Sequence, residues 1–342
     1  MRKLLNVLYV TTPDSHLSRD GENVVVKVKG CERARFPVHT LEGIVCFGYL
    51  GATPALMDLC CDRGVSISYV SEFGRFLARV SGPVNGNIML RREQYRIADT
   101  PSRRASIARN AVLGKILNCR TVLLRFLRDH GAVDRPMVVD ACDALLSLGR
   151  AVEINGDVDS IRGIEGEAAR RYFEVFNALI TVDSDRLSVT GRSRRPPRDP
   201  VNALLSFLYT LLASECTSAL ETVGLDPQAG FLHTDRSGRP GLALDLMEEL
   251  RPYLADRMAL TLINSRQVSE DGFEIRESGA VLMDEATRKT VITAWHKRKQ
   301  EDTTHPYLGE KIKIGLVPYA QALLLARHIR GDLDGYPPFF TR

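Results

Sequence analysis

The spacing of apolar residues changes once along the chain, and this change constrains the fold more than any other feature of the sequence. Up to residue 80, short apolar runs rich in β-branched residues are separated by glycines. This pattern predicts one short helix at 53–62 and strands at 4–11, 23–29, 41–47, 65–70 and 75–80. A cluster of glycine, proline and asparagine at 82–86 marks a linker. Beyond it, apolar residues recur at helical spacing, as at Val112, Ile116, Leu123 and Leu127.

We therefore expect an α+β protein with a small β-rich N-terminal domain (1–82), a linker (83–88) and a larger all-helical C-terminal domain (89–342). Further helices are predicted at 138–148, 158–179, 200–223, 242–263, 285–300 and 309–330, with a small hairpin at 273–283. Asp199 before Pro200 is typical of a helix N-terminus, and Pro252 is expected to kink or split its helix.

The composition is that of an ordinary globular protein, with 44% hydrophobic and 26% charged residues. The most apolar stretch, 203–213, is interrupted by polar residues and is shorter than the roughly 20 residues of a membrane helix, so we expect no membrane span and a cytoplasmic location. The seven cysteines include no C-x-x-C pair, which favours buried thiols over disulfides or a zinc cluster.

Basic residues gather in three regions, although the net charge is only +4. Between residues 86 and 129, ten Lys or Arg stand against three acidic residues. Two further clusters are 192–198, with four arginines that include Arg194 and Arg195, and 297–313, with five basic residues. Such patches suggest a polyanion partner, and a solvated helix surface is the alternative interpretation. The sequence has no Walker A, G-x-G-x-x-G or G-x-S-x-G motif, which disfavours nucleotide-dependent and serine-hydrolase chemistry.

Two acidic residues of the predicted helix 242–263 are candidates for a buried site. Asp245 and Glu248 are three positions apart and share a helix face, and apolar residues flank Asp245 on both sides. A carboxylate in such surroundings is costly unless it is paired or bound to a metal. The alternative is that Asp245, Glu248 and Glu249 form the solvent-exposed face of this helix.

Glu165 is a third acidic candidate, because Gly163 and Gly166 bracket it inside an otherwise helical segment. One reason for two such glycines is close approach of a ligand or of another backbone. The alternative is a helix that begins near Gly166, with Glu165 in its first turn.

His233 follows an apolar run and precedes a Gly/Pro loop, which places it half-buried at the edge of a core. A structural histidine is the alternative to a ligand there. Glu165, His233 and Glu248 together would form a site that suits Mg²⁺ or Mn²⁺, although their spacing matches no local ligand signature. His305, in the basic C-terminal region, is interpreted as a surface or nucleic-acid contact.

Three segments in the same order, 163–173, 200–209 and 230–248, resemble the motifs of the CRISPR-associated integrase/endonuclease family "Cas one", which inserts new spacers into CRISPR arrays. The resemblance extends along essentially the whole chain, and 304–309 and 336–339 are similar to the type I-C branch. Gly241 departs from the family, which commonly has Ser before the acidic helix.

The resemblance implies a divalent-metal site of Glu165, His233 and Glu248, with Asp245 as a second acid of the same motif. It also places DNA-contacting or near-site groups at Arg162, Tyr209 and Arg251. Arg194 and Arg195, in the basic cluster 192–198, are predicted as further DNA contacts. The implied reaction is transesterification by the 3′-hydroxyl ends of a double-stranded DNA fragment (the prespacer) on CRISPR repeat DNA.

The resemblance further implies a homodimer that forms through the N-terminal domain. Two such dimers would be bridged by a dimer of the small "Cas two" protein, and a "Cas four" nuclease would act in the same systems. Two alternatives remain open: a metal-dependent DNA nuclease without an integration role, and a non-enzymatic DNA-binding scaffold.

Overall fold

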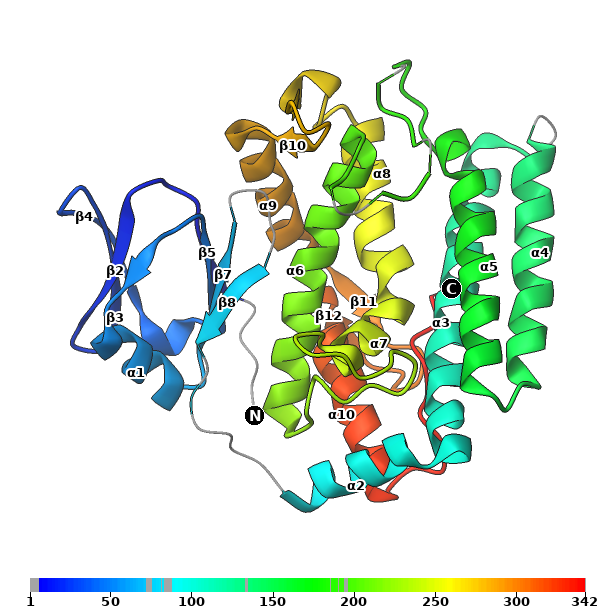
Figure 1. Cartoon of the computed structure of the whole chain (residues 1–342). Coiled ribbons are helices and arrows are strands. Elements are labelled where there is room, and N and C mark those ends of the chain that lie inside the picture. Colours follow the sequence, from blue (N-terminus) through cyan, green and yellow to red (C-terminus); the bar gives the residue numbers. More distant parts are fainter. Residues whose placement is uncertain are drawn as a thin grey trace. The chain divides into compact units, whose positions relative to one another are not determined.

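The computed structural model describes residues 6–71, 76–80, 82, 88–132, 135–184, 186–189, 191–193 and 196–341, and its chain divides into two compact units (Figure 1). Unit 1 comprises Met1–Asn85, Arg288–Glu301 and Lys313–Leu316, and unit 2 comprises Gly86–Thr287, Asp302–Ile312 and Val317–Arg342. The chain thus first changes units within the predicted linker, of which residues 83–87 lie outside the described residues.

Two C-terminal segments group with unit 1, whereas the sequence predicts one continuous domain over 89–342. Within unit 1, the guanidinium of Arg288 lies 6.0 Å from the ring centroid of Phe47, and Trp295 is fully buried. The contact between Phe47 and Arg288 joins residues more than 200 positions apart along the chain, and no local sequence pattern predicts it.

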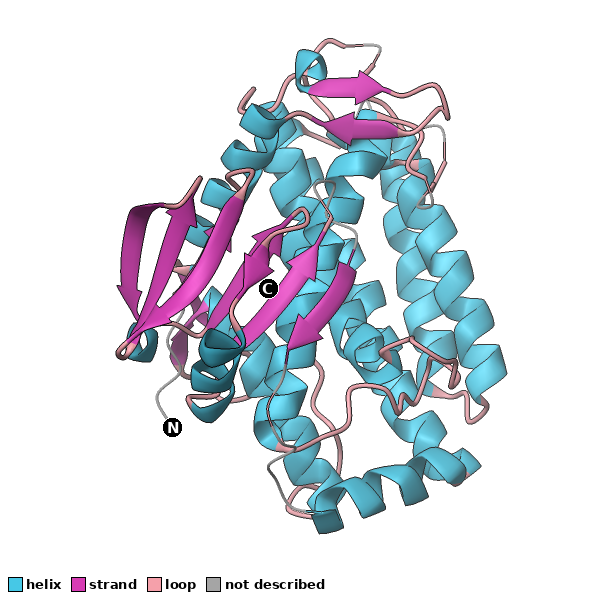
Figure 2. Ribbon diagram, turned by 60° about the vertical axis from the view of Figure 1, so that its left-hand side comes forward, coloured by secondary structure: helices cyan, strands magenta, loops and turns pink. Residues whose placement is uncertain are grey.

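Unit 1 contains two four-stranded sheets among the described residues (Figure 2). In the first, with the order β1-β5-β7-β8, three strands are parallel: β1 (Val7–Val10), β5 (Gly43–Phe47) and β7 (Ser66–Val70); β8 (Phe76–Val80) is antiparallel to β7. The second sheet is an antiparallel meander of β2 (Ser15–Asp20), β3 (Asn23–Val28) and β4 (Cys31–Pro37), with β6 (Gly51–Ala52) parallel to β2.

Helix α1 (Pro54–Asp62) lies between the strands in sequence and contributes to their core. Its N-cap is Thr53, whose hydroxyl accepts a hydrogen bond from the Leu56 amide at 3.3 Å. Leu56 is buried in one apolar cluster with Leu17 of the second sheet and Ile44 of the first. Burial of these β-branched and leucine side chains is the main stabilising term of unit 1.

Unit 2 is mainly helical. Its helices are α2 (Ile88–Asp99), α3 (Pro101–His130), α4 (Pro136–Glu153), α5 (Val158–Glu174), α6 (Pro200–Val223), α7 (Gly241–Leu250), α8 (Arg257–Asn264) and α10 (Val317–Arg330), and α9 (Glu285–Lys299) continues from unit 2 into unit 1. Short strands pair as β9 (Phe273–Ile275) with β10 (Val281–Met283) and as β11 (Asp302–Thr304) with β12 (Lys311–Lys313). The long helix α3 packs against α4, α5 and α7, and α6 packs against α7 and α10. The α+β class predicted from the sequence is confirmed.

Helix α6 begins as predicted, since Asp199 Oδ1 accepts from the Asn202 amide at 2.7 Å. By length and composition it is the one helix of the described residues that could cross a membrane. More than half of its apolar window is buried inside the protein. This packing is that of a core helix.

The predicted helix 242–263 is split as expected, because a π-helical segment, η3 (Arg251–Asp256), contains Pro252 and separates α7 from α8. The prediction for 309–330 is too long: β12 and a 3₁₀ turn, η5 (Ile314–Leu316), precede α10. The hairpin predicted at 273–283 is confirmed by β9 and β10. All seven cysteines are free thiols and five of them are buried, as the sequence indicates.

Candidate active site

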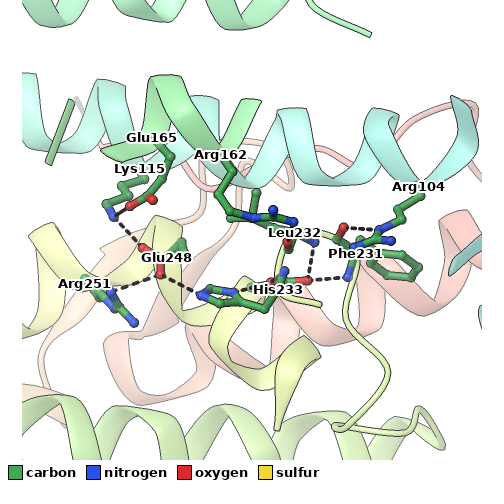
Figure 3. A network of polar contacts seen from close by, with 10 residues as sticks. Arg104, Lys115, Arg162, Glu165, Phe231, Leu232, His233, Glu248 and Arg251 are labelled. Carbon is green, nitrogen blue, oxygen red and sulfur yellow. Dashed lines mark hydrogen bonds and ion pairs between the residues drawn. The ribbon is translucent and has the colours of Figure 1, made fainter. Parts of the chain in front are cut away.

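The predicted ligands lie close together in unit 2, where a lysine that the sequence analysis did not select bridges the two glutamates (Figure 3). Glu165 comes from α5, Glu248 from α7 and His233 from the loop before α7. Lys115 Nζ of α3 contacts Glu165 Oε1 and lies 2.7 Å from Glu248 Oε2. Glu248 Oε1 lies 3.0 Å from Arg251 Nη1 and 3.9 Å from His233 Nε2.

A glycine brings α3 close enough to α7 for this contact. A Cβ atom on Gly114 would lie 2.9 Å from Glu249 Cβ and 3.2 Å from Pro338 Cβ, closer than ordinary side chains approach. Because Gly114 has no side chain, α3 reaches α7 and places the next residue, Lys115, beside Glu248.

The segment around Glu165 is continuous helix, so the interpretation that a helix begins near Gly166 is wrong. Helix α5 begins at Val158, and its N-cap Asp157 accepts from the Ser160 amide at 2.8 Å. Outside helix α5 itself, no described residue lies within 4 Å of a Cβ atom built on Gly163 or Gly166. The two glycines therefore leave open space on either side of Glu165.

The acidic residues of α7 point inward, so the solvent-face interpretation is also wrong. Asp245, Glu248 and Glu249 are all at most 3% exposed. Asp245 accepts hydrogen bonds from three consecutive backbone amides, those of Phe231 (2.5 Å), Leu232 (2.9 Å) and His233 (3.0 Å).

The same carboxylate lies 2.6 Å from the ring nitrogen Nδ1 of His233. A carboxylate at this position fixes the proton on Nδ1 and leaves the Nε2 lone pair free to face Glu248. Asp245 therefore orients His233, and its contacts are those of a positioning residue.

Two arginines donate hydrogen bonds to the backbone of the loop that carries His233. Arg104 Nε donates to the Phe231 carbonyl at 2.7 Å, and Arg162 Nη2 donates to the Leu232 carbonyl at 3.0 Å. A Cβ atom on Gly241 would lie 2.7 Å from the Gln228 carbonyl oxygen. This glycine, which departs from the family pattern, thus allows the loop that carries His233 to approach the start of α7 closely.

The cluster is ionised and nearly balanced in charge. Burial acts to raise the pKa of Glu248, but Arg251 and Lys115 together hold it below its ordinary value. Burial acts to lower the pKa of Lys115, and the two glutamates hold it above its ordinary value. Two carboxylates and two cations therefore face one another in a buried setting, where each needs a partner.

Tyr209 lies against Arg251 of this cluster. The Tyr209 hydroxyl donates to Asp256 Oδ1 at 2.6 Å. The guanidinium groups of Arg192 and Arg251 each lie 5.0 Å from the centroid of its ring. Burial raises the pKa of Asp256 to about 6. The predicted DNA contacts Arg194 and Arg195 lie outside the described residues.

A second buried network connects the chain end to α7. Glu249 accepts from Gln321 Nε2 (2.9 Å), from the Tyr336 hydroxyl and from the Phe339 amide (2.8 Å). His305 pairs with Gln321 Oε1 at 2.9 Å and is fully buried, so its interpretation as a surface contact is wrong. The segments that resemble the type I-C branch thus supply residues of the network around Glu249, the neighbour of Glu248 in α7.

Among the described residues, no three His, Cys, Asp or Glu side chains are arranged as metal ligands, and the ammonium of Lys115 stands between the two glutamates. The donor set nevertheless suits a divalent cation: one oxygen each of Glu165 and Glu248 meets the same ammonium, and His233 Nε2 faces the other oxygen of Glu248 at 3.9 Å. Oxygen-rich sets of this kind are typical of Mg²⁺ and Mn²⁺.

Known proteins resemble this chain over most of its length. The family model "CRISPR associated protein Cas1" matches residues 8–297. The "CRISPR-associated endonuclease Cas1 2" of Rhodospirillum rubrum is 52% identical over 347 residues and covers all of both chains. The "CRISPR-associated endonuclease Cas1 1" of Chlorobaculum tepidum is 51% identical, again over the whole of both chains. A "Cas4/endonuclease Cas1 fusion" of Geobacter sulfurreducens is 33% identical over 98% of this chain and 60% of its own.

Solved structures show the same fold. The Cas1 protein TM1797 of Thermotoga maritima has a TM-score of 0.82 at 22% identity and covers 98% of this chain and all of its own. A casposase bound to integration product has a TM-score of 0.82 at 20% identity, with 97% and 93% covered. A chain of a "Cas6-RT-Cas1--Cas2 complex" has a TM-score of 0.83 at 23% identity, with 98% and 36% covered. The match of the family model over most of the chain and the identity to curated relatives show that this chain belongs to the CRISPR-associated Cas1 family.

Proposed function

We propose that the chain is a divalent-metal-dependent DNA endonuclease and integrase of CRISPR adaptation, which joins the 3′-hydroxyl ends of captured DNA to the CRISPR repeat by transesterification. The observation that carries the proposal is that Glu165, His233 and Glu248, from three separate elements, lie in one cluster in which both glutamates already hold a cation, Lys115. The relatives named endonuclease support strand cleavage. The casposase of similar fold, described with its integration product, supports strand joining.

Glu165, His233 and Glu248 would hold Mg²⁺ or Mn²⁺. A divalent ion bound there supplies Lewis-acid activation of the phosphodiester and of the attacking hydroxyl. The chain's own contribution is orientation: Asp245 holds His233 with Nε2 toward Glu248, and Arg251 holds the second oxygen of Glu248. With three protein ligands, positions remain for phosphate oxygens and for the attacking group.

Arginines near the site would bind the DNA backbone. Arg162, with a side chain that is 38% exposed, lies at the loop of His233. Arg251 contacts Glu248, and Tyr209 lies against Arg251. Arg194 and Arg195 would add phosphate contacts from the basic loop. Such contacts supply affinity that depends on salt and carries little sequence information.

The proposed assembly is a homodimer through the N-terminal unit, bridged by a Cas2 dimer and acting in the cytoplasm on prespacer DNA with 3′ ends and on repeat DNA. A solved complex that contains Cas1 and Cas2 supports the Cas2 partner. The fusion of Cas4 to a Cas1 relative supports a functional association with a Cas4 nuclease.

The test is joining of a labelled DNA fragment to a repeat-containing plasmid, with and without Cas2 and with Mg²⁺, Mn²⁺ or EDTA. A fragment with 3′-deoxy ends serves as the matched control. We expect a joined product only with metal and a 3′-hydroxyl. Metal-dependent cleavage without joined product in the presence of Cas2 would favour the nuclease without an integration role, and absence of both reactions would favour the scaffold.

A further inference from the structure

We propose that Lys115 is an internal counter-cation that takes the place of the divalent ion in the metal-free protein and so makes metal binding depend on bound DNA. This inference rests on the proposed function, since it concerns the same metal and the same DNA. It assigns a role to a residue that neither the motifs nor the resemblance singled out.

The geometry places Lys115 where a metal ion would stand. Its Nζ contacts Glu165 Oε1 and lies 2.7 Å from Glu248 Oε2, so it bridges the two glutamates from different helices (Figure 3). Lys115 is 7% exposed, and Gly114 fixes its helix close to α7. Both partners of this largely buried ammonium are therefore proposed metal ligands.

The charge balance of the cluster gives the consequence. Glu165 and Glu248 are offset by Lys115 and Arg251, so these four side chains carry no net charge before any metal enters. A dication bound to the two glutamates would take both partners of Lys115 and stand beside its like charge. The ammonium must then turn away or find another anion.

A DNA phosphate supplies that anion. With phosphate at the site, Lys115 exchanges carboxylate partners for phosphate oxygens, and the added negative charge offsets the dication. Metal and DNA therefore stabilise each other's binding, and this coupling is reciprocal. An enzyme built in this way holds its metal tightly only on its substrate.

The experiment measures Mn²⁺ binding from the electron paramagnetic resonance signal of free Mn²⁺, with and without a DNA duplex that carries 3′-deoxy ends and cannot react. The variants are Lys115→Gln, which keeps a hydrogen-bond donor, and Lys115→Met. The matched control is Arg120→Gln, which removes a cation from the same helix; Arg120 Nε donates to the Cys142 carbonyl at 3.1 Å. The Glu248→Gln variant lacks a proposed ligand, so its signal reports the Mn²⁺ that DNA attracts when the site is lost.

We expect DNA to tighten Mn²⁺ binding by wild type and by Arg120→Gln about tenfold or more, within the usual range of coupling between two ligands. Lys115→Gln should bind Mn²⁺ without DNA about tenfold more tightly than wild type, and DNA should add little. The rise in melting temperature on Mn²⁺ addition should be larger for Lys115→Gln than for wild type. This second readout does not depend on whether Lys115→Met folds.

Equal Mn²⁺ affinity and equal DNA effect in wild type and Lys115→Gln would overturn the inference. If Glu248→Gln has lost the site in that case, the proposed metal function stands and only the role of Lys115 fails. If wild type binds no more Mn²⁺ than Glu248→Gln with or without DNA, the proposed metal function itself is wrong.

Discussion

Replacement of Asp245 by Ala should destabilise the protein more than loss of a catalytic side chain alone would. Asp245 accepts the amides of Phe231 and Leu232, and both residues are at most 2% exposed. Alanine leaves both amides buried without a partner. Each such group costs about 1–3 kcal/mol, so we expect a loss of about 2–6 kcal/mol. That is a large part of the ~5–15 kcal/mol by which folded proteins are stable.

Asp245→Asn separates this structural role from the orientation of His233. The asparagine oxygen can still accept the two buried amides, while its NH₂ group takes the place of Oδ1, faces Nδ1 of His233 and leaves the His233 amide without its acceptor. The ring must then accept at Nδ1 and carry its proton on Nε2, where it cannot bind a metal. We expect stability within about 2 kcal/mol of wild type, but Mn²⁺ affinity about 10–100-fold weaker, as for other residues that orient metal ligands.

Urea unfolding, Mn²⁺ titration and the ¹⁵N chemical shifts of the His233 ring are the measurements for the two variants. An Asp245→Ala protein within about 1 kcal/mol of wild type would show that Asp245 does not hold the loop. An Asp245→Asn protein with wild-type Mn²⁺ affinity and an unchanged His233 tautomer would refute the orientation argument.

Three further predictions concern pH, metal and charge. Burial raises the pKa of Asp256 from 3.8 to about 6, so folding favours the protonated carboxyl. The stability that Asp256 contributes in its protonated form is fully present below about pH 4 and is lost as pH rises to about 6.5. Asp256→Asn should therefore gain about 3 kcal/mol relative to wild type over that range in urea unfolding, and a pH-independent difference would contradict this. Excess EDTA should abolish strand cleavage and joining, and added Mn²⁺ should restore them; full activity in EDTA would exclude the metal mechanism. Replacing Arg194 and Arg195 together by Glu should weaken DNA binding more at low than at high salt in gel-shift titrations, and equal weakening at both would mean that these arginines do not contact phosphate.

Much of the fold could be predicted from the sequence, because apolar periodicity reports the buried face of each element. The strands at β3, β5 and β7, the N-cap Asp199 and the break at Pro252 follow from local pattern alone. β2 and β4 were not predicted because they are largely polar, with partly or largely exposed side chains. Their pairing with β3 is what makes them strands.

The site could be predicted only in part. Glu165, His233 and Glu248 belong to segments that resemble a known family, whereas their convergence depends on how α5, α7 and a loop pack. Lys115 carries a weak local signal, a lysine within the buried apolar stripe of α3, and nothing in the sequence tells which acids it meets. The roles of Arg104 and Glu249 depend on contacts more than 70 residues away along the chain.

The most direct measurement of the central claim is the position of Mn²⁺ in crystals of the protein grown with Mn²⁺ and unreactive DNA, located by its anomalous scattering. We expect one strong peak about 2.1–2.3 Å from Glu165, His233 Nε2 and Glu248 together, with Lys115 Nζ turned away from both glutamates and toward a phosphate. The account would be contradicted by a peak elsewhere, or by Lys115 still bridging the two glutamates, in crystals whose protein joins DNA in the presence of Mn²⁺.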